Sequence, residues 1–244
     1  MLKNKVAIVT GSSKGIGAGI AKRFAAEGAS VVVNYNSDAD GAAKVVASIE
    51  QTGGRAIAVR ADTSKAAEVE RLFAETDRVF GKLDILVNNA GVYSFAPLEG
   101  AELATLQHHL AVNVNGPFMT MQAALKRMSK GGVIINISSS AVRLSMAGTA
   151  TYTASKAALD AISRIVAKEV GARGIRVNTI SPGPTMTEGA AKMAVDPEVI
   201  KHIIASLPLG RPGDPADIAS AAAFLASDQA SWITGENLTV AGGQ

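Results

Sequence analysis

The sequence lacks cysteine altogether and contains few aromatic residues. With no Cys among its 244 residues, disulfides, thiolate nucleophiles, iron–sulfur clusters and Cys-ligated zinc are all excluded. Aromatic side chains make up only 4% of the chain, whereas glycine occurs 24 times. A core of small side chains lets backbones approach closely, which favours a tightly wound α/β sheet over a β-sandwich.

Neither positive nor negative side chains are in large excess. The chain has 24 Lys and Arg against 21 Asp and Glu, a formal net charge of +3, with no clustered basic run. So small an excess makes no electrostatic case for a nucleic-acid partner. We therefore expect no nucleic acid among its partners.

Long apolar runs are missing as well. The apolar run 6–9 is too short for the core of a signal peptide. The longest charge-free stretch, 103–125, reaches the length of a membrane span but contains Gln107, Asn113 and Asn115, which hydrocarbon tolerates poorly. We expect a buried helix there, no membrane partner and a cytoplasmic protein.

Short β-branched runs alternate with Ala-rich segments of helical period along most of the chain. The runs are continuously apolar, the pattern of a parallel sheet covered on both faces. The expected strands are 5–10, 30–34, 55–60, 85–87, 133–137, 175–180 and 238–240, with helices over 16–27, 38–51, 64–80 and 150–170. This alternation predicts an α/β fold, a single Rossmann-type doubly wound domain over 1–244 with a seven-stranded parallel sheet.

One irregular region interrupts this alternation between residues 181 and 214. It contains five prolines around a short helical piece near 198–205. A long excursion of this kind is typical of a lid over a binding site. We predict a lid segment over about 184–210.

A glycine-rich turn follows the first expected strand. Residues 10–17 read Thr-Gly-Ser-Ser-Lys-Gly-Ile-Gly, which is neither a P-loop nor the G-x-G-x-x-G spacing. A pyrophosphate site needs a tight turn, a bare backbone and exposed N–H groups at a helix N-terminus. Between a strand and a long helix, Gly11, Gly15 and Gly17 favour nucleotide binding over an ordinary strand–helix turn.

The end of the second expected strand bears on which dinucleotide binds. NAD sites usually place an acidic residue about 20 residues past the motif, where it holds the ribose 2′-hydroxyl. Here Asn34-Tyr35-Asn36-Ser37 stands at that place, and the first acid is Asp38. An uncharged end with Lys14 nearby suits a 2′-phosphate. We predict NADP(H) as the cofactor, with NAD(H) as the alternative.

A tyrosine and a lysine share one face of the helix expected over 150–170. Tyr152 and Lys156 are four residues apart. A neighbouring ammonium favours the phenolate, which predicts a lowered pKa for Tyr152 and a proton donor and acceptor near neutrality. Upstream, Ser138, Ser139 and Ser140 follow the fifth strand, where ligands of parallel sheets bind.

Further motif residues are spread along nearly the whole chain, and with those above they are Thr10–Gly17, Asp62, Asn88–Gly91, Asn113, Ser139, Tyr152, Lys156, Asn178, Pro182-Gly183, Gly235 and Gly242-Gly243. In this order and spacing, the chain resembles the classical short-chain dehydrogenase/reductase family over nearly its whole length. Two positions depart from the family pattern. Val142, followed by Arg143, stands where glycine is frequent, which leaves the shape of the substrate pocket open. Ala241 replaces an acid near the C-terminus, in a subunit-packing region.

The resemblance implies roles for four catalytic residues. Tyr152 would be the general acid or base that exchanges the substrate's proton, and Ser139 would hydrogen-bond the carbonyl or alcohol oxygen. Lys156 would lower the pKa of Tyr152 and bind the nicotinamide ribose, and Asn113 would hold a water of the proton relay. Hydride chemistry then belongs to the cofactor, and the protein supplies orientation and electrostatics.

The resemblance also implies a cofactor-binding set, in which Asp62 contacts the adenine and Thr185 and Thr187 hold the nicotinamide carboxamide. Besides Tyr152 and Lys156, the predicted set is Gly11, Ser13, Lys14, Gly15, Ile16, Gly17, Asn34, Tyr35, Asn36, Ser37, Asp62, Thr63, Asn89, Ala90, Gly91, Pro182, Gly183, Thr185 and Thr187.

Several residues have structural alternatives. Asn113 would then only kink its helix, Asn88–Gly91 would brace the sheet, and Thr187 would cap a helix. Arg143 would be either an acceptor of a substrate carboxylate or phosphate or an ordinary surface arginine.

The predicted function is an NADPH-dependent oxidoreductase that transfers a hydride between nicotinamide and a ketone, a β-keto (thio)ester or the corresponding secondary alcohol. The alternatives are an NAD-dependent alcohol or sugar dehydrogenase and a non-catalytic dinucleotide sensor. The three histidines and the absence of G-x-S-x-G exclude a Ser-His-Asp hydrolase, and no spacing predicts a metal. Apolar residues in 92–98, 142–149 and 186–207 favour a hydrophobic or medium-chain carbonyl, and the resemblance implies a homo-oligomer, tetramer or dimer.

Overall fold

The computed structural model describes residues 1–191, 198, 201 and 204–244, so part of the predicted lid (192–197, 199–200 and 202–203) lies outside the described residues. One sheet has the strand order β3-β2-β1-β4-β5-β6-β7, and every neighbouring pair is parallel. The strands are β1 (Val6–Val9), β2 (Ser30–Tyr35), β3 (Arg55–Arg60), β4 (Ile85–Asn88), β5 (Val133–Ile137), β6 (Arg176–Pro182) and β7 (Asn237–Val240). The predicted single Rossmann-type domain with a seven-stranded parallel sheet is confirmed.

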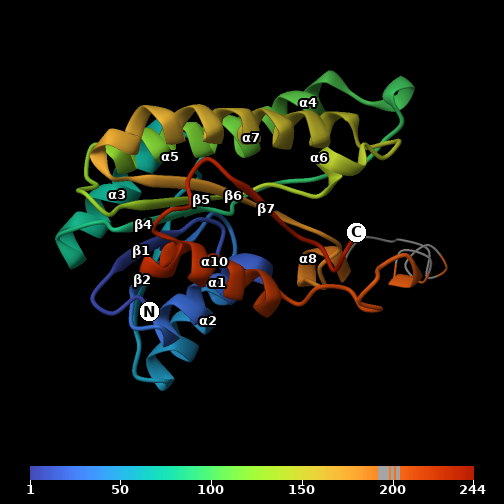
Figure 1. Ribbon diagram of the computed structural model, residues 1–244. Coiled ribbons are helices and arrows are strands. Elements are labelled where there is room, and N and C mark those ends of the chain that lie inside the picture. The colour runs from blue at the N-terminus through green and yellow to red at the C-terminus, as the bar shows by residue number, and fades with distance from the viewer. Residues whose placement is uncertain (192–197, 199–200, 202–203) are drawn as a thin grey trace.

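Helices cover both faces of this sheet (Figure 1). One face carries α1 (Gly15–Ala26), α2 (Ala39–Gln51) and α10 (Pro215–Ala226), and the other carries α3 (Ala66–Phe80), α5 (Gly116–Leu125) and α7 (Ala150–Val170). Shorter elements are η1 (Leu98–Gly100), α4 (Leu103–Leu110), α6 (Ala141–Leu144), η3 (Gly171–Arg173), α8 (Glu188–Ala191) and η4 (Asp228–Ala230). Within the described ranges, no helix is long and apolar enough to cross a membrane.

Both faces of the central strands are buried, which explains their continuous apolar runs. Successive side chains of a strand point to opposite faces. In β1, Ala7 and Val9 therefore pack into the core beneath α1, α2 and α10, while Ile8 packs into the core beneath α3, α5 and α7. Two cores on one sheet hold the strand ends rigidly, and the carboxyl edge of the sheet is free to position functional groups.

The helix predicted over 103–125 is divided by a π-helical turn. α4 ends at Leu110, η2 (Ala111–Asn115) forms the turn, and α5 begins at Gly116. Asn113 lies at the centre of this turn and is fully buried. Such turns occur frequently at functional sites, because the extra residue redirects a side chain. The prediction of one continuous helix is wrong on this point, since hydrophobic periodicity does not reveal a single inserted residue.

Candidate active site

The predicted site residues gather at the carboxyl edge of the sheet, because all neighbouring strands run parallel. Six strands contribute: Gly11–Gly17 follow β1, Asn34–Ser37 end and follow β2, Asp62 and Thr63 follow β3, Asn89–Gly91 follow β4, Ser139 follows β5, and Pro182–Thr187 end and follow β6. Asn113 from η2 and the pair Tyr152 and Lys156 from α7 complete the group.

The glycine-rich turn packs directly against the loop after β4. A Cβ added to Gly11, whose φ is +60°, would lie 2.7 Å from the Ala90 Cα. A Cβ on Gly17 would lie 2.4 Å from Asn89 Nδ2 and 2.5 Å from the Gly11 oxygen. Since real Cβ atoms do not approach so closely, only glycine fits at either position. The turn therefore presents bare backbone, as close approach of a dinucleotide requires.

The N-terminus of α1 already binds an anionic oxygen from a distant part of the chain. The Gly15 N–H donates to Glu188 Oε2 at 3.0 Å, and Glu188 belongs to α8. Lys14, the residue that precedes the helix, makes no side-chain capping bond. Unpaired N–H groups and the helix dipole favour negative charge here. A carboxylate oxygen at this point shows that the turn accepts an anionic oxygen, as a phosphate-binding turn must.

Asn34 is enclosed at the end of β2. Its side chain is buried, and its Oδ1 accepts from the Gly11 N–H at 3.2 Å. Its Nδ2 donates to the carbonyls of Val59 and Ala61 at 3.2 and 3.0 Å. This one amide ties the glycine-rich turn to β2 and β3. Asn34 thus supports the cofactor-side turn from within the sheet.

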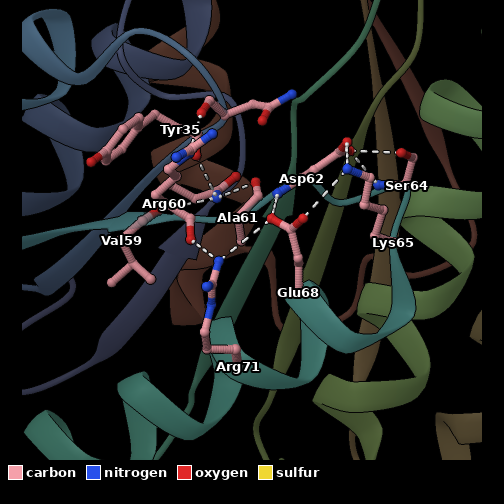
Figure 2. A network of polar contacts seen from close by, with 11 residues as sticks. Tyr35, Val59, Arg60, Ala61, Asp62, Ser64, Lys65, Glu68 and Arg71 are labelled. Carbon is pink, nitrogen blue, oxygen red and sulfur yellow. Dashed lines mark hydrogen bonds and ion pairs between the residues drawn. The ribbon is translucent and has the colours of Figure 1, made fainter.

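A polar network fixes the segment after β3 (Figure 2). The Asp62 carboxylate accepts from the Ser64 N–H at 3.0 Å and from the Ser64 hydroxyl at 2.7 Å, and it pairs with Lys65 at 3.5 Å. Burial acts to raise the pKa of Asp62, but these partners outweigh it and lower the pKa. Arg60 Nε donates to the Asn36 carbonyl at 3.0 Å. The network holds Asp62 ionised and in place beside the end of β2.

Lys156 is buried on the inner face of α7. Its Nζ donates to the Ile137 carbonyl at 2.8 Å. A Cβ added to Gly91 would lie 3.4 Å from this Nζ and 3.2 Å from Asn113 Oδ1, so the loop after β4 also passes beside both groups. Three segments far apart in sequence therefore meet at Lys156.

Asn113 joins the loop after β4 to α7. Its Oδ1 accepts from the Val92 N–H at 2.8 Å, and its Nδ2 donates to the Val92 carbonyl at 2.9 Å. The same Nδ2 donates to Ser155 Oγ at 3.0 Å, and that hydroxyl donates to the Tyr152 carbonyl at 2.6 Å. The π-helical turn aims the amide at these partners. Asn113 therefore does more than kink its helix.

The pKa predicted for Tyr152 is wrong in direction. Burial raises the pKa of the Tyr152 phenol, and a hydrogen bond with Ser139 only partly offsets this. The lysine four residues later is itself buried, and burial lowers the pKa of Lys156 to about 8. The spacing of Tyr152 and Lys156 indicates the attraction between the two groups, but their common loss of solvation depends on the folded chain around them.

The Lys156 pKa leads to a testable effect of pH on stability. An unfolded lysine titrates near 10.5, so between pH 8 and 10.5 the unfolded chain binds more protons than the folded chain. Folding therefore becomes more favourable as the pH rises through this window. We expect the free energy of unfolding of the wild type, relative to that of Lys156→Met, to rise by about 1.4 kcal/mol per pH unit. Urea unfolding of both proteins across the window measures the difference, and a flat difference would contradict the buried lysine.

The other predicted residues lie on the same edge, and some have clear structural contacts. Asn89 Nδ2 donates to the carbonyls of Thr10 and Gly11 at 2.9 Å each, which matches the bracing alternative. Thr185 Oγ1 donates to the Gly183 carbonyl at 2.9 Å. Thr187 directly precedes α8. The residues placed along this edge without further assignment are Ser13, Ile16, Tyr35, Ser37, Thr63, Ala90 and Pro182.

Arg143 contacts the end of the chain. Its exposed guanidinium donates to the backbone oxygen of Gln244, and Ser140 Oγ donates to Gln244 Oε1 at 2.9 Å. These bonds give Arg143 a structural role that neither alternative from the sequence anticipated.

Sequence reasoning missed the surroundings of the Tyr152 ring. His109 is buried, and its ring centroid lies 6.1 Å from that of Tyr152. Tyr93 and Phe95 lie 6.4 and 5.8 Å from it by the same measure. Two aromatic residues shortly after Asn88–Gly91 were the available signal. Only the folded chain shows that they lie beside the Tyr152 ring.

Comparison with known proteins identifies the family. A family model described as enoyl-(acyl carrier protein) reductase matches residues 11–244. The 3beta-hydroxysteroid dehydrogenase 1 of Eggerthella lenta is 44% identical over 245 residues, which cover 99% of this chain and 94% of that protein.

Two solved structures are similar over nearly the whole chain. A short-chain dehydrogenase from Burkholderia cenocepacia in complex with NADP has a TM-score of 0.93 and 38% identity, covering 99% of this chain and 98% of its own. A 7 alpha-hydroxysteroid dehydrogenase complexed with NADH and 7-oxo glycochenodeoxycholic acid has a TM-score of 0.95 and 40% identity, covering 99% and 94%. Together with the glycine-rich turn and the Tyr152/Lys156 pair, these matches place the chain in the classical short-chain dehydrogenase/reductase family, as an oxidoreductase that uses a nicotinamide cofactor.

Proposed function

We propose that this protein is an NADPH-dependent carbonyl reductase that also oxidises the corresponding secondary alcohol. One observation carries the proposal. Tyr152, Lys156, Ser139 and Asn113 meet at the carboxyl edge of the sheet, directly beside Gly91 and the glycine-rich turn. Proton-transfer groups and a dinucleotide cradle are thus on one edge, as hydride transfer to a carbonyl requires.

In this proposal each side chain has a defined task. Gly11–Gly17 and Lys156 would hold the nicotinamide cofactor, which when bound would supply the hydride that the carbonyl carbon accepts. Tyr152 donates its phenolic proton to the carbonyl oxygen, which converts the ketone into the alcohol, and Ser139 holds that oxygen by a hydrogen bond. The raised pKa of the Tyr152 phenol keeps it protonated at neutral pH, so it is ready to donate its proton. Lys156 binds the nicotinamide ribose, and Asn113 holds a water that returns the proton.

The test is a steady-state assay of the purified protein with NADPH and a panel containing ketones and β-keto esters. We expect NADPH oxidation that depends on both ketone and enzyme. If no ketone, β-keto ester or secondary alcohol in the panel turns over with either NADP(H) or NAD(H), the proposed function is wrong and the dinucleotide-sensor alternative gains support.

Lys14 is the proposed partner of the cofactor's 2′-phosphate. Its Nζ lies 3.9 Å from the Asp38 carboxylate, at the turn that follows β2. We expect Lys14→Ala to weaken NADPH binding about tenfold and NADH binding little, because only NADPH carries the phosphate that the ammonium attracts. Calorimetric titration of both cofactors measures this. Equal losses for NADPH and NADH would contradict a specific role for Lys14.

One observation favours the NAD-dependent alternative. The Asp38 carboxylate accepts from the Gly41 N–H at 3.0 Å as the cap of α2, so a negative charge is held near the end of β2. A carboxylate there repels a 2′-phosphate. Tighter binding of NADH than of NADPH by the wild type would favour an NAD-dependent alcohol or sugar dehydrogenase.

We also propose that residues 1–244 act as one catalytic domain in a cytoplasmic homo-oligomer, with 184–210 as the lid. Exposed apolar side chains on α4 and α7 support the proposed oligomer. Leu103 of α4 is 68% exposed, and Ile165 of α7 is 57% exposed. Burying such side chains against another subunit is favourable.

A further inference from the structure

Aromatic rings gather around the catalytic tyrosine. The Tyr93 and Phe95 ring centroids are 6.2 Å apart, with an angle of only 25° between the ring planes. The Tyr152 ring is 6.4 and 5.8 Å from these two and stands at 75° and 78° to them. The chain has only ten aromatic residues, Phe 6, Tyr 3 and Trp 1, so three of them in one cluster is a strong local enrichment.

The segment that carries Tyr93 and Phe95 is held on three sides. Ser94 Oγ is 3.2 Å from His109 Nε2, which belongs to α4. The Ala96 N–H donates to the Gly148 carbonyl at 2.9 Å, just before α7. These contacts fix the backbone on both sides of Phe95.

On the third side, the Tyr93 hydroxyl touches α8. A Cβ added to Gly189 would lie only 2.7 Å from the Tyr93 hydroxyl oxygen, so a residue without a Cβ is needed here to leave room for the phenol. The two aromatic rings are therefore held in position between the start of the predicted lid and the catalytic tyrosine.

Both rings remain open to solvent although they are held in place. Tyr93 is 40% exposed and Phe95 is 48% exposed. Partly exposed aromatic faces beside a proton-donating phenol are a surface on which a substrate can lie. Partial burial raises the pKa of the Tyr93 phenol, so this surface carries no charge at neutral pH.

We propose that Tyr93 and Phe95 form an aromatic wall that selects ketones and secondary alcohols bearing a flat, apolar ring system. The inference rests on the proposed carbonyl reductase function and narrows its substrate class. Planar rings stack on aromatic faces with a gain beyond the buried area alone. A polyol would lose hydrogen bonds to water against these faces, and a flexible acyl chain would lose conformational freedom without gaining a stacked contact.

The test compares two ketones with the same number of carbon atoms. β-Tetralone carries a fused flat ring, whereas methyl octyl ketone is an open chain. We expect a higher kcat/KM for β-tetralone. Phe95→Leu keeps an apolar side chain but removes the aromatic face, and we expect it to lower the ratio of the two kcat/KM values by roughly three- to tenfold.

Phe118→Leu is the matched control. Phe118 is 46% exposed on α5, similar to Phe95, and the substitution is the same, so a general effect of losing a surface ring appears in both variants. Binding of the non-reacting flat compound β-naphthol, measured by calorimetry, provides a readout independent of turnover. It should weaken in Phe95→Leu and stay unchanged in Phe118→Leu.

The possible failures are distinct. If the wild type reduces methyl octyl ketone or a β-keto ester as efficiently as β-tetralone, or if Phe95→Leu behaves like Phe118→Leu in both measurements, the aromatic wall is refuted while the reductase function stands. If no ketone is reduced with either cofactor, the reductase function itself is refuted. β-Naphthol binding that depends on Phe95 would then still support a flat ligand at this wall.

Discussion

Tyr152→Phe is expected to lower kcat about a thousandfold while leaving dinucleotide affinity nearly unchanged. The substitution removes only the phenolic oxygen that donates the proton. The ring itself remains, packed against Tyr93, Phe95 and His109, so the shape of the site is kept. Measurement of kcat for ketone reduction, together with calorimetric titration of the cofactor, separates the loss of proton transfer from a loss of binding.

A neighbouring hydroxyl is the control for this experiment. Thr153 donates its hydroxyl to Thr149 Oγ1 at 2.8 Å on the same helix. Thr153→Val removes that hydroxyl at similar volume and should leave kcat close to the wild-type value. If Tyr152→Phe retains a tenth or more of the wild-type kcat (a deficit of at most about 1.4 kcal/mol in the barrier), another group is the proton donor.

Gly17→Ala is expected to abolish detectable dinucleotide binding and to destabilise the protein by about 1–3 kcal/mol. The new Cβ would lie 2.4 Å from Asn89 Nδ2, 2.5 Å from the Gly11 oxygen and 2.9 Å from the Ser12 Cα. Two of these neighbours are backbone atoms of the glycine-rich turn, so the turn has to move. Cofactor titration and urea unfolding measure the two effects.

Gly171→Ala is the matched control for the glycine-rich turn. Among the described residues, no heavy atom beyond Gly171 itself and its chain neighbours lies within 4 Å of the Cβ that this change would add, and the φ of −56° suits any residue. Because alanine restricts the unfolded chain, Gly171→Ala should be neutral or stabilise by about 0.4–1 kcal/mol, with unchanged cofactor binding. Wild-type stability and cofactor affinity in Gly17→Ala would show that the turn has more room than its geometry indicates.

Much of the site was predictable because its geometry follows from local rules. Tyr152 and Lys156 share a helix face whenever that segment is helical, and the structure has α7 over the predicted 150–170. The carboxyl ends of parallel strands share one edge, so the residues after β1 and β5 lie on the same edge of the sheet. The strand ends themselves differ from prediction by only one or two residues.

Other features depend on contacts between distant segments. Glu188 accepts from the Gly15 N–H although the two residues are 173 positions apart, and no spacing within either segment predicts that contact. The same holds for Tyr93 and Phe95, whose distance from Tyr152 is set by the packing of α4, α7 and α8 around them.

By itself, the sequence determined the class of chemistry. A chain without cysteine, with a glycine-rich turn after its first strand and a Tyr152/Lys156 pair, has a phenol, an amine and hydroxyls to work with, and it needs a bound cofactor for redox steps. The tertiary structure alone decided how those groups ionise and what surrounds them. Burial raises the pKa of Tyr152 and lowers that of Lys156, because loss of solvation depends on every segment that packs around a group and not on its neighbours in sequence.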